Sequence, residues 1–304
     1  MIKRTIEISR APAYVSTKDE QLLIRPTRDK SAEPASIPYE DIGVVVVDEP
    51  ACTYTHQALA KLMEAGAVLV VCGAKHLPAG ILLPLPSHTE VVWRVQEQLS
   101  AGLPLRKRLW RQIVRAKIQA QMRVLHPTSA ARRQLARLAD EVRSGDPENA
   151  EGQAARIYWE AWLQESGPFR RDPDSEDIVN SLLNYGYAIV RAAVARALVA
   201  GGLLPAAGLH HCNRSDAFCL ADDLMEPLRP LVDERARAVW LGGCRELDRA
   251  AKAALLEVLT ATVRVGDQTG PLMVALHRTV ASLVRCYQGR DRELALPEAA
   301  EVCI

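Results

Sequence analysis

Hydrophobic and polar residues follow two different periods along the chain, and the change falls near residue 86. Before it, short aliphatic runs alternate with Pro, Gly and Asp breakers, a pattern typical of β-strands. We predict strands at IEI (6–8), AYVS (13–16), QLLIRP (21–26), IGVVVV (42–47) and AVLVVC (67–72). Between the last two we predict a helix that starts at a Thr53 or Thr55 cap and ends at Gly66.

After residue 88 the apolar positions recur with the helical period of 3.6 residues. We predict helices at about 89–122, 128–143, 150–163, 175–200, 217–241, 246–263 and 267–288. The Pro- and Gly-rich segment 73–88 is interpreted as a hinge. The predicted fold class is α+β, with a small β-rich N-terminal domain (1–86) followed by a larger all-α helical domain (87–304).

Composition agrees with two ordinary globular domains. The chain has 304 residues, of which 48% are hydrophobic and 25% charged, so each half can bury a core of its own. The N-terminus, MIKRTIEISR, lacks the apolar run of a signal peptide. No stretch reaches the ~18 uninterrupted apolar residues that a membrane span needs. We therefore expect a cytoplasmic protein without a membrane partner.

The seven cysteines are odd in number and form no CxxC pair. In the absence of a secretion signal this favours reduced thiols over disulfides, and a structural zinc site is the alternative. Cys212 follows His211 directly. A Cys/His nucleophile there is disfavoured, because neighbouring side chains point in different directions.

The net charge of +1 hides an uneven distribution. From His88 to Arg143, twelve Lys or Arg residues face four Asp or Glu, a net of +8, which leaves −7 for the rest of the chain. Such a segment suits a polyanion, although a solvated helix face is the simpler alternative. The candidate nucleic-acid contacts are Arg106, Lys107, Arg108, Arg111, Arg115 and Lys117. Backbone contacts of this kind predict binding that is independent of sequence and sensitive to salt.

An acidic residue stands at the start of the predicted helix 150–163. In DPENAEGQAARIYWEAW (146–162), Pro147 and Asn149 indicate the helix start and place Glu151 in the first turn. Acidic residues are common there because they complement the helix dipole, which is the alternative to a functional role.

A second polar cluster lies in GLHHCNRSDAFCLADDLMEPLRPLVD (208–233). Two histidines, His210 and His211, precede a predicted helix on which Asp222, Asp223 and Glu226 share a face. Carboxylates beside an imidazole are typical of a metal site, and this ligand set favours manganese while permitting magnesium. A hydrogen-bonded structural histidine is the alternative.

The chain resembles a known family, CRISPR-associated protein one, which is the adaptation integrase. It is most similar to the type II branch of that family. Three stretches carry the resemblance in this order: ENAEGQAARIYW, SLLNYGYAIVRA and the 208–233 segment. LAKLMEAGAVLVVCG and HLPAG, within 59–80, resemble the N-terminal domain of that family. The resemblance covers essentially the whole chain. It implies a β-sandwich-like N-terminal domain, a helical C-terminal domain, and the insertion of short DNA duplexes into a repeat array.

The resemblance also implies a ligand set for Mg²⁺ or Mn²⁺. It assigns Glu151 in E-G-x-x-A-x-x-Y, His211 at the end of G-x-x-H, and Glu226 in L-x-x-D-L-M-E as metal ligands and catalytic residues. Asp223 is a fourth candidate, and His210 is assigned to packing or to the surroundings of the site.

The implied partners are double-stranded DNA, a second copy of the chain in a homodimer, and CRISPR-associated protein two. The alternatives are a metal-dependent nuclease that transfers the strand to water, and a non-catalytic DNA-binding scaffold.

Overall fold

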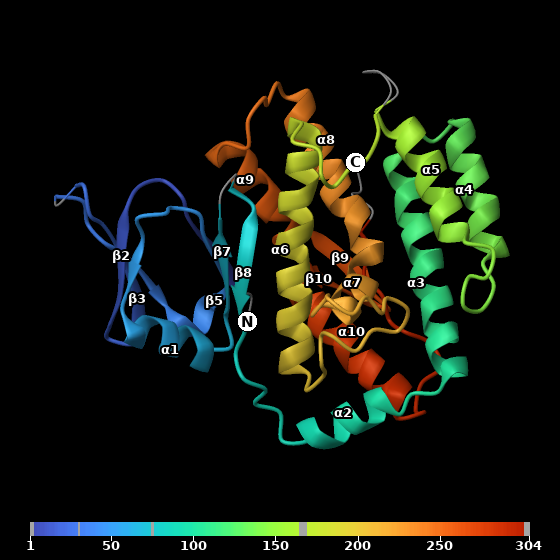
Figure 1. Ribbon diagram of the computed structural model, residues 1–304, viewed down its shortest axis with the longest axis horizontal. Coiled ribbons are helices and arrows are strands. Elements are labelled where there is room, and N and C mark those ends of the chain that lie inside the picture. Colours follow the sequence, from blue (N-terminus) through green and yellow to red (C-terminus); the bar gives the residue numbers. More distant parts are fainter. Residues whose placement is uncertain (1–2, 30, 74–75, 164–168, 301–304) are drawn as a thin grey trace.

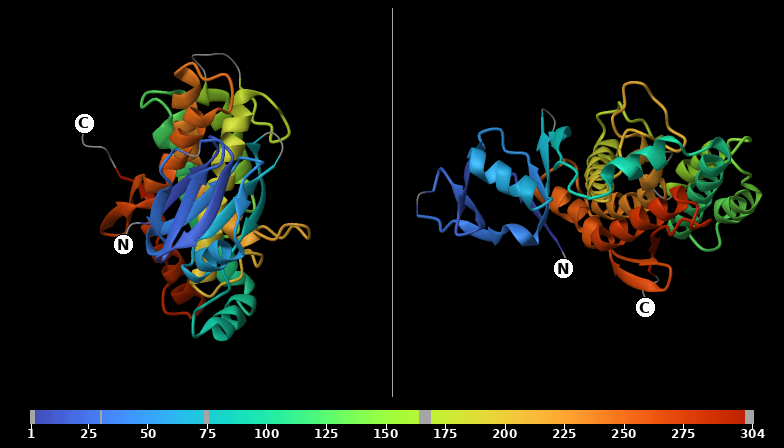
Figure 2. Two further views of the ribbon diagram at one scale, coloured as in Figure 1. Left: turned by 90° about the vertical axis from the view of Figure 1, so that its left-hand side faces the viewer. Right: turned by 90° about the horizontal axis from the view of Figure 1, so that it is seen from below.

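A computed structural model of the chain describes residues 3–29, 31–73, 76–163 and 169–300. It shows a β-rich N-terminal lobe beside a larger helical lobe (Figure 1). Seen from below, helices α3 to α5 lie at the end of the molecule farthest from the N-terminal strands (Figure 2). This arrangement confirms the α+β class and the order of the two parts.

Two four-stranded sheets build the N-terminal lobe. In the first sheet β1 (Arg4–Ile8), β5 (Ile42–Val47) and β7 (Val68–Cys72) are parallel, and β8 (Pro78–Leu82) pairs antiparallel with β7. The second sheet runs in the order β4 (Ala35–Pro38), β3 (Gln21–Pro26), β2 (Ala13–Lys18) and β6 (Thr53–Tyr54). Helix α1 (His56–Glu64) begins after Thr55, whose side chain accepts a hydrogen bond from the Ala58 amide.

All five predicted strands are present, and β3 and β5 have the predicted bounds. The prediction missed β4, β6 and β8. Strand β8 lies inside the segment that was interpreted as a hinge. Its proline occupies the first position of an edge strand, where a missing amide costs no ladder hydrogen bond. Pro and Gly in 73–88 therefore do not prevent pairing with β7.

All six residues of β5 are buried, and they face two different cores. Ile42, Val45 and Val47 pack between the two sheets and α1. Val44 and Val46 belong to the large core of the helical lobe. Burial on both faces explains why IGVVVV has no polar alternation. It also means that the first sheet contributes to both cores.

Nine α-helices of the described residues form the second lobe around a central helix, α6. They are α2 (Val91–Leu99), α3 (Leu103–Val124), α4 (Ala130–Glu141), α5 (Ala150–Trp162), α6 (Ile178–Ala200), α7 (Cys219–Met225), α8 (Arg229–Leu241), α9 (Arg249–Leu256) and α10 (Leu272–Tyr287). Helix α6 is long and apolar enough to cross a membrane, but 83% of its apolar 18-residue stretch is buried inside the protein. It is the core helix of this lobe.

Two predicted helices are each divided by proline. The single helix expected at 89–122 is wrong, because α2 ends at Leu99 and α3 starts after Gly102 with Pro104 in its first turn. The helix expected at 217–241 is split into α7, a 3₁₀ turn at Glu226–Leu228, and α8. Proline is favoured at helix starts and lacks the amide needed further inside a helix.

The second lobe is also not entirely helical, which corrects the prediction for 246–288. Helix α9 is followed by β9 (Thr262–Val265) and β10 (Gln268–Pro271), which form a hairpin, and β11 (Glu298–Ala299) pairs with β9. Val263 and Val265 point inward and alternate with exposed residues, the period of a strand. Gly266 provides the positive φ of the turn.

The cysteine prediction concerns six described residues, because Cys303 lies outside them. All six are free thiols, which confirms the expectation of reduced cysteines there. Within the described ranges no three His, Cys, Asp or Glu side chains form a ready-made metal cage, so a structural zinc site is not supported.

A buried ion pair joins the two lobes. Lys252 on α9 contacts Asp48, which follows β5, and both side chains are almost fully buried. The Nδ1 atom of His76 lies 3.0 Å from the same carboxylate. Removal of one partner from a buried pair leaves an uncompensated charge, which destabilises the fold more than a surface pair does.

We expect Lys252→Met to lower the free energy of unfolding by about 3 kcal/mol, because the buried Asp48 side chain loses its lysine partner. Urea unfolding followed by circular dichroism would measure the change. Lys18→Met, at an exposed position on β2, is the control and should differ from wild type by less than about 0.5 kcal/mol. Equal stability of the Lys252 and Lys18 variants would show that the pair does not connect the lobes energetically.

Candidate functional site

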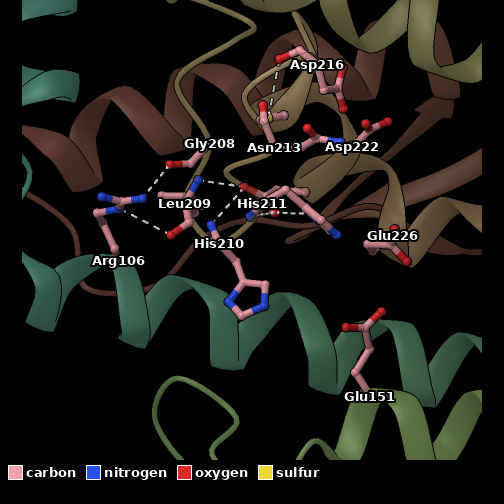
Figure 3. A network of polar contacts seen from close by, with 12 residues as sticks. Arg106, Glu151, Gly208, Leu209, His210, His211, Asn213, Asp216, Asp222 and Glu226 are labelled. Atoms are coloured by element: carbon pink, nitrogen blue, oxygen red, sulfur yellow. Dashed lines mark hydrogen bonds and ion pairs between the residues drawn. The ribbon is translucent and has the colours of Figure 1, made fainter.

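One face of α3 holds the loop that carries the two histidines. Arg106 donates from Nε to the carbonyl of Leu209 (3.1 Å) and from a terminal nitrogen to that of Gly208 (3.0 Å). One turn later Trp110 stacks on His210, with ring centroids 4.2 Å apart and planes 2° from parallel. This stacking agrees with the packing alternative for His210, and a place in the surroundings of the site stays a prediction. These contacts fix the loop on α3, and those of Arg106 are shown in Figure 3.

Asp223 organises the same loop from the inside. Its fully buried carboxylate accepts the amides of Leu209 (2.5 Å), His210 (3.0 Å) and His211 (3.2 Å). A side chain at Gly208 would overlap the carbonyl oxygen of His211, so glycine is required for this tight turn. Asp223 is thus committed to the loop and does not face a metal as a free ligand.

The imidazole of His211 is oriented by the same carboxylate. Its Nδ1 lies 2.7 Å from Asp223 Oδ1, so the tautomer that donates from Nδ1 leaves the Nε2 lone pair free. The ring reaches from the loop toward the side where Glu226 and Glu151 lie (Figure 3). The hydrogen bond to Asp223, followed by the charges of Asp223, Glu226 and Glu151, raises the pKa of His211.

The start of α5 places Glu151. Asn149, which was predicted to mark the helix start, is the cap. Its backbone is left-handed, and its side chain accepts the amide of Gly152 (3.1 Å). Asp146 accepts the amides of Ala150 and Glu151 at 2.8 and 3.0 Å. The first-turn amides are satisfied by these two residues, so the carboxylate of Glu151 is not needed as a cap.

Glu226 lies at the start of the turn between α7 and α8, where its side chain is only 4% exposed. Its Oε1 accepts from Arg229 Nε at 2.8 Å, and its Oε2 lies 2.5 Å from Lys117 Nζ. Burial alone would raise the pKa of Glu226, but the charges of Arg229 and Lys117 outweigh it and bring the pKa to about 2. The carboxylate is therefore ionised at neutral pH.

Lys117 on α3 lies between the two glutamates. Its ammonium donates to Glu151 Oε1 at 2.6 Å and lies next to Glu226 Oε2, and the side chain is 9% exposed. Burial opposes its charge, but Glu226 and Glu151 keep its pKa above the usual value. This placement corrects the expectation that Lys117 lies on a DNA-binding surface.

A second buried network supports Arg229. The hydroxyls of Tyr158 (2.9 Å) and Tyr187 donate to the two oxygens of Asp233, and the Arg229 guanidinium lies over the Tyr187 ring, 4.6 Å from its centroid. Burial raises the pKa of Asp233 to about 7. Arg229 and Asp233 were not predicted as parts of the site, although Arg229 follows Glu226 at i+3 spacing.

The remaining candidate residues have different surroundings. Asp222 forms an ion pair with Arg191 on α6 and does not share the position of Glu226.

Arg111 donates to the carbonyl of Val142 (2.8 Å), so its guanidinium, like that of Arg106, binds the protein itself. Lys107 is exposed, and Arg108 and Arg115 are partly exposed. DNA contacts by these three residues stay a prediction.

The side chains of Glu151, Glu226 and His211 fit a divalent cation. Two carboxylates and a free imidazole nitrogen match the donors that Mg²⁺ and Mn²⁺ accept. The ammonium of Lys117 between the carboxylates shows that this point already favours a cation. As they stand, no three acidic, His or Cys groups of the described residues surround a common point, so a bound ion requires these side chains to move.

Solved structures share this fold. A casposase bound to integration product aligns with 96% of this chain and 92% of its own, with a TM-score of 0.79 and 17% identity. A Cas1 protein from Thermotoga maritima aligns with 98% of this chain and all of its own, with a TM-score of 0.74 and 15% identity. At these identities the likeness shows a shared fold.

Sequence comparison then gives the family. The model of the CRISPR associated protein Cas1 family matches residues 6–240. The CRISPR-associated endonuclease Cas1 of Neisseria meningitidis serogroup C is 37% identical over 289 residues, which cover 93% of this chain and 92% of the relative. A Cas1 relative from Pyrobaculum aerophilum is 29% identical over 82% of this chain and 88% of its own. The chain belongs to the Cas1 family, which confirms the resemblance found in its motifs.

The pKa of Asp233 gives a testable pH dependence. An unfolded Asp titrates near 3.9, whereas the folded value is about 7. Between these values the folded state keeps a proton that the unfolded state has released. This residue therefore makes the free energy of unfolding fall as pH rises, by at most about 1.4 kcal/mol per pH unit, and has no further effect above the folded pKa.

We expect Asp233→Asn to lose this dependence, because an amide does not titrate in this range. Urea unfolding of both proteins from about pH 4 to pH 8 would show the variant gaining stability relative to wild type until about pH 7. A difference between the two proteins that stays constant with pH would contradict the raised pKa.

Proposed function

We propose that this Cas1 protein is a metal-dependent DNA integrase of CRISPR adaptation. The 3′-hydroxyl of a short prespacer duplex would attack a backbone phosphate at the edge of a repeat. One observation carries the proposal. Asp223 orients the imidazole of His211, and this ring points toward the carboxylates of Glu151 and Glu226 (Figure 3). The shared fold with a casposase bound to integration product supports the same class of reaction.

The proposed step is a transesterification. A new P–O bond forms to the attacking 3′-oxygen, the P–O bond to the departing 3′-oxygen breaks, and the proton of the attacking hydroxyl ends on the departing oxygen. One phosphodiester replaces another, so no nucleotide hydrolysis is needed. The nucleophile belongs to the DNA, so no side chain of the protein becomes covalently attached.

The residues of the site would position the reacting groups. Glu151, Glu226 and His211 would hold Mg²⁺ or Mn²⁺, which supplies Lewis acidity to a phosphoryl oxygen. Asp223 fixes the tautomer of His211 through its Nδ1 contact. Arg229 holds Oε1 of Glu226, while Oε2 lies against the Lys117 ammonium. Ordered carboxylates reduce the reorganisation needed when charge develops on the phosphate.

The proposed partners are double-stranded DNA, a second copy of the chain, and CRISPR-associated protein two. One chain of a solved Cas6-RT-Cas1–Cas2 complex aligns with 99% of this protein, with a TM-score of 0.76 and 17% identity; the match covers 36% of that longer chain. The composition of that complex supports CRISPR-associated protein two as a partner. A cytoplasmic location follows from the proposed substrate, a chromosomal repeat array.

Strand transfer to water is the second candidate function. The relative from Neisseria is named an endonuclease, and the same three ligands would serve hydrolysis. The two functions differ in their products. Incubation with Mn²⁺, a short duplex and supercoiled repeat DNA gives joined strands for an integrase and nicked plasmid alone for a nuclease.

We expect Glu151→Gln and His211→Ala each to reduce strand joining by at least about 100-fold, because each removes a ligand that acts on the reacting phosphate. Duplex DNA binding should be unchanged, as fluorescence anisotropy would show. Cys212→Ala is the matched control, since Cys212 is exposed beside His211 and has no role in the mechanism. Joining by either ligand variant at the wild-type rate would refute the proposed site.

Salt dependence tests the DNA surface. Lys107, Arg108 and Arg115 are predicted to contact phosphates, and each contact should contribute about 0.9 to the slope of log affinity against log salt concentration. We expect the triple change to Ala to reduce that slope in magnitude, with Lys18→Ala as the control on the other lobe. A slope equal to that of wild type would exclude these residues from the DNA interface.

A further inference from the structure

Among the polar contacts of the described residues, Lys117 pairs with two carboxylates. Its ammonium lies 2.6 Å from Glu151 Oε1 and 2.5 Å from Glu226 Oε2. This oxygen of Glu226 is buried, and the Lys117 ammonium is the cation that lies against it. Lys117 thus bridges residues from two separate elements, the start of α5 and the turn after α7.

The ammonium occupies the space that a divalent ion would need. Magnesium lies about 2.1 Å from each carboxylate oxygen that it binds. An ion at that distance from both Glu151 Oε1 and Glu226 Oε2 would lie close to the Lys117 ammonium, which contacts the same two oxygens, and the two positive charges would repel. The ammonium and the metal therefore compete for this pair of oxygens.

Charge leads to the same conclusion. Glu151 and Glu226 carry two negative charges, and Lys117 and Arg229 carry two positive charges in direct contact with them. A divalent ion added to this neutral group would leave a net charge of +2 in a mostly buried place, which is costly. Lys117 has a flexible four-carbon stem that can move. Arg229 is held by Glu226 and by the Tyr187 ring.

We propose that Lys117 is a built-in counter-ion that holds Glu151 and Glu226 together before metal binds, and that the metal displaces it. The inference rests on the metal site of the proposed function. Competition from Lys117 lowers the affinity for the metal and keeps the carboxylates ordered without it. The displaced ammonium becomes available to pair with a phosphoryl oxygen of bound DNA, which restores the charge balance.

Metal binding by Lys117→Met tests the competition without any measurement of activity. The thioether chain has a similar length and no charge. We expect Mn²⁺, titrated alone and followed by the electron paramagnetic resonance of the free ion, to bind the variant about tenfold or more tightly than wild type. The metal-free variant should melt at a lower temperature, and added Mn²⁺ should raise its melting temperature more than that of wild type.

Lys107→Met, also on α3 but exposed, controls for the loss of one positive charge and should bind Mn²⁺ like wild type. Equal or weaker binding by a folded Lys117→Met would overturn the inference and leave the metal site intact. Absence of Mn²⁺ binding in both wild type and Lys117→Met would instead overturn the metal site itself, and the inference with it.

Chemical labelling of the wild-type protein gives a second test that does not depend on a variant folding. Acetic anhydride modifies exposed amines, and peptide mass spectrometry measures each lysine separately. Lys117 should react slowly in metal-free protein and faster when Mn²⁺ is added, while Lys107 reacts at a constant rate. An unchanged rate at Lys117 under saturating Mn²⁺ would mean that the ammonium is not displaced.

Discussion

A single face of α3 holds the functional centre together. Arg106 binds the carbonyls of the histidine loop, Trp110 stacks on His210, and Lys117 bridges Glu151 and Glu226. The spacing of four and seven residues brings these side chains to the same side of the helix. Segments that are far apart in sequence therefore meet because each one contacts α3. The geometry of the site therefore depends on the packing of α3 more than on any single ligand.

The charges around the site are buried in matched pairs. Asp223 is neutralised by backbone amides and His211, and Glu226 by Arg229 and Lys117. Burial raises the pKa of Asp233, and the hydrogen bonds from its two tyrosine hydroxyls offset this only in part. A buried carboxylate keeps its charge only where a cation or several donors compensate for lost water. Glu226 therefore stays ionised and can hold a cation, whereas Asp233 contributes to the stability of the fold.

Local signals were sufficient for much of the fold and for Glu151. The apolar run of β5 and the Asn149 cap of α5 are decided by residues within one element, and both were predicted. The break between α2 and α3 was also readable from Gly102 and Pro104, although periodicity alone concealed it. The surface position expected for Lys117 was wrong, because the helical spacing of basic residues does not tell which of them is buried. That depends on the packing of α5 and the α7–α8 turn against α3, which no local pattern contains.

The first sheet belongs to two cores, because Val45 and Val47 face one and Val44 and Val46 face the other. A cut in the chain after the last strand of this sheet would therefore not separate two self-sufficient modules. Each fragment would present a bare aliphatic surface to water and would be prone to aggregation. Exchange of N-terminal lobes between distant relatives would succeed only if Val44 and Val46 of β5, which are buried against the helical lobe, were exchanged together with the helices that cover them.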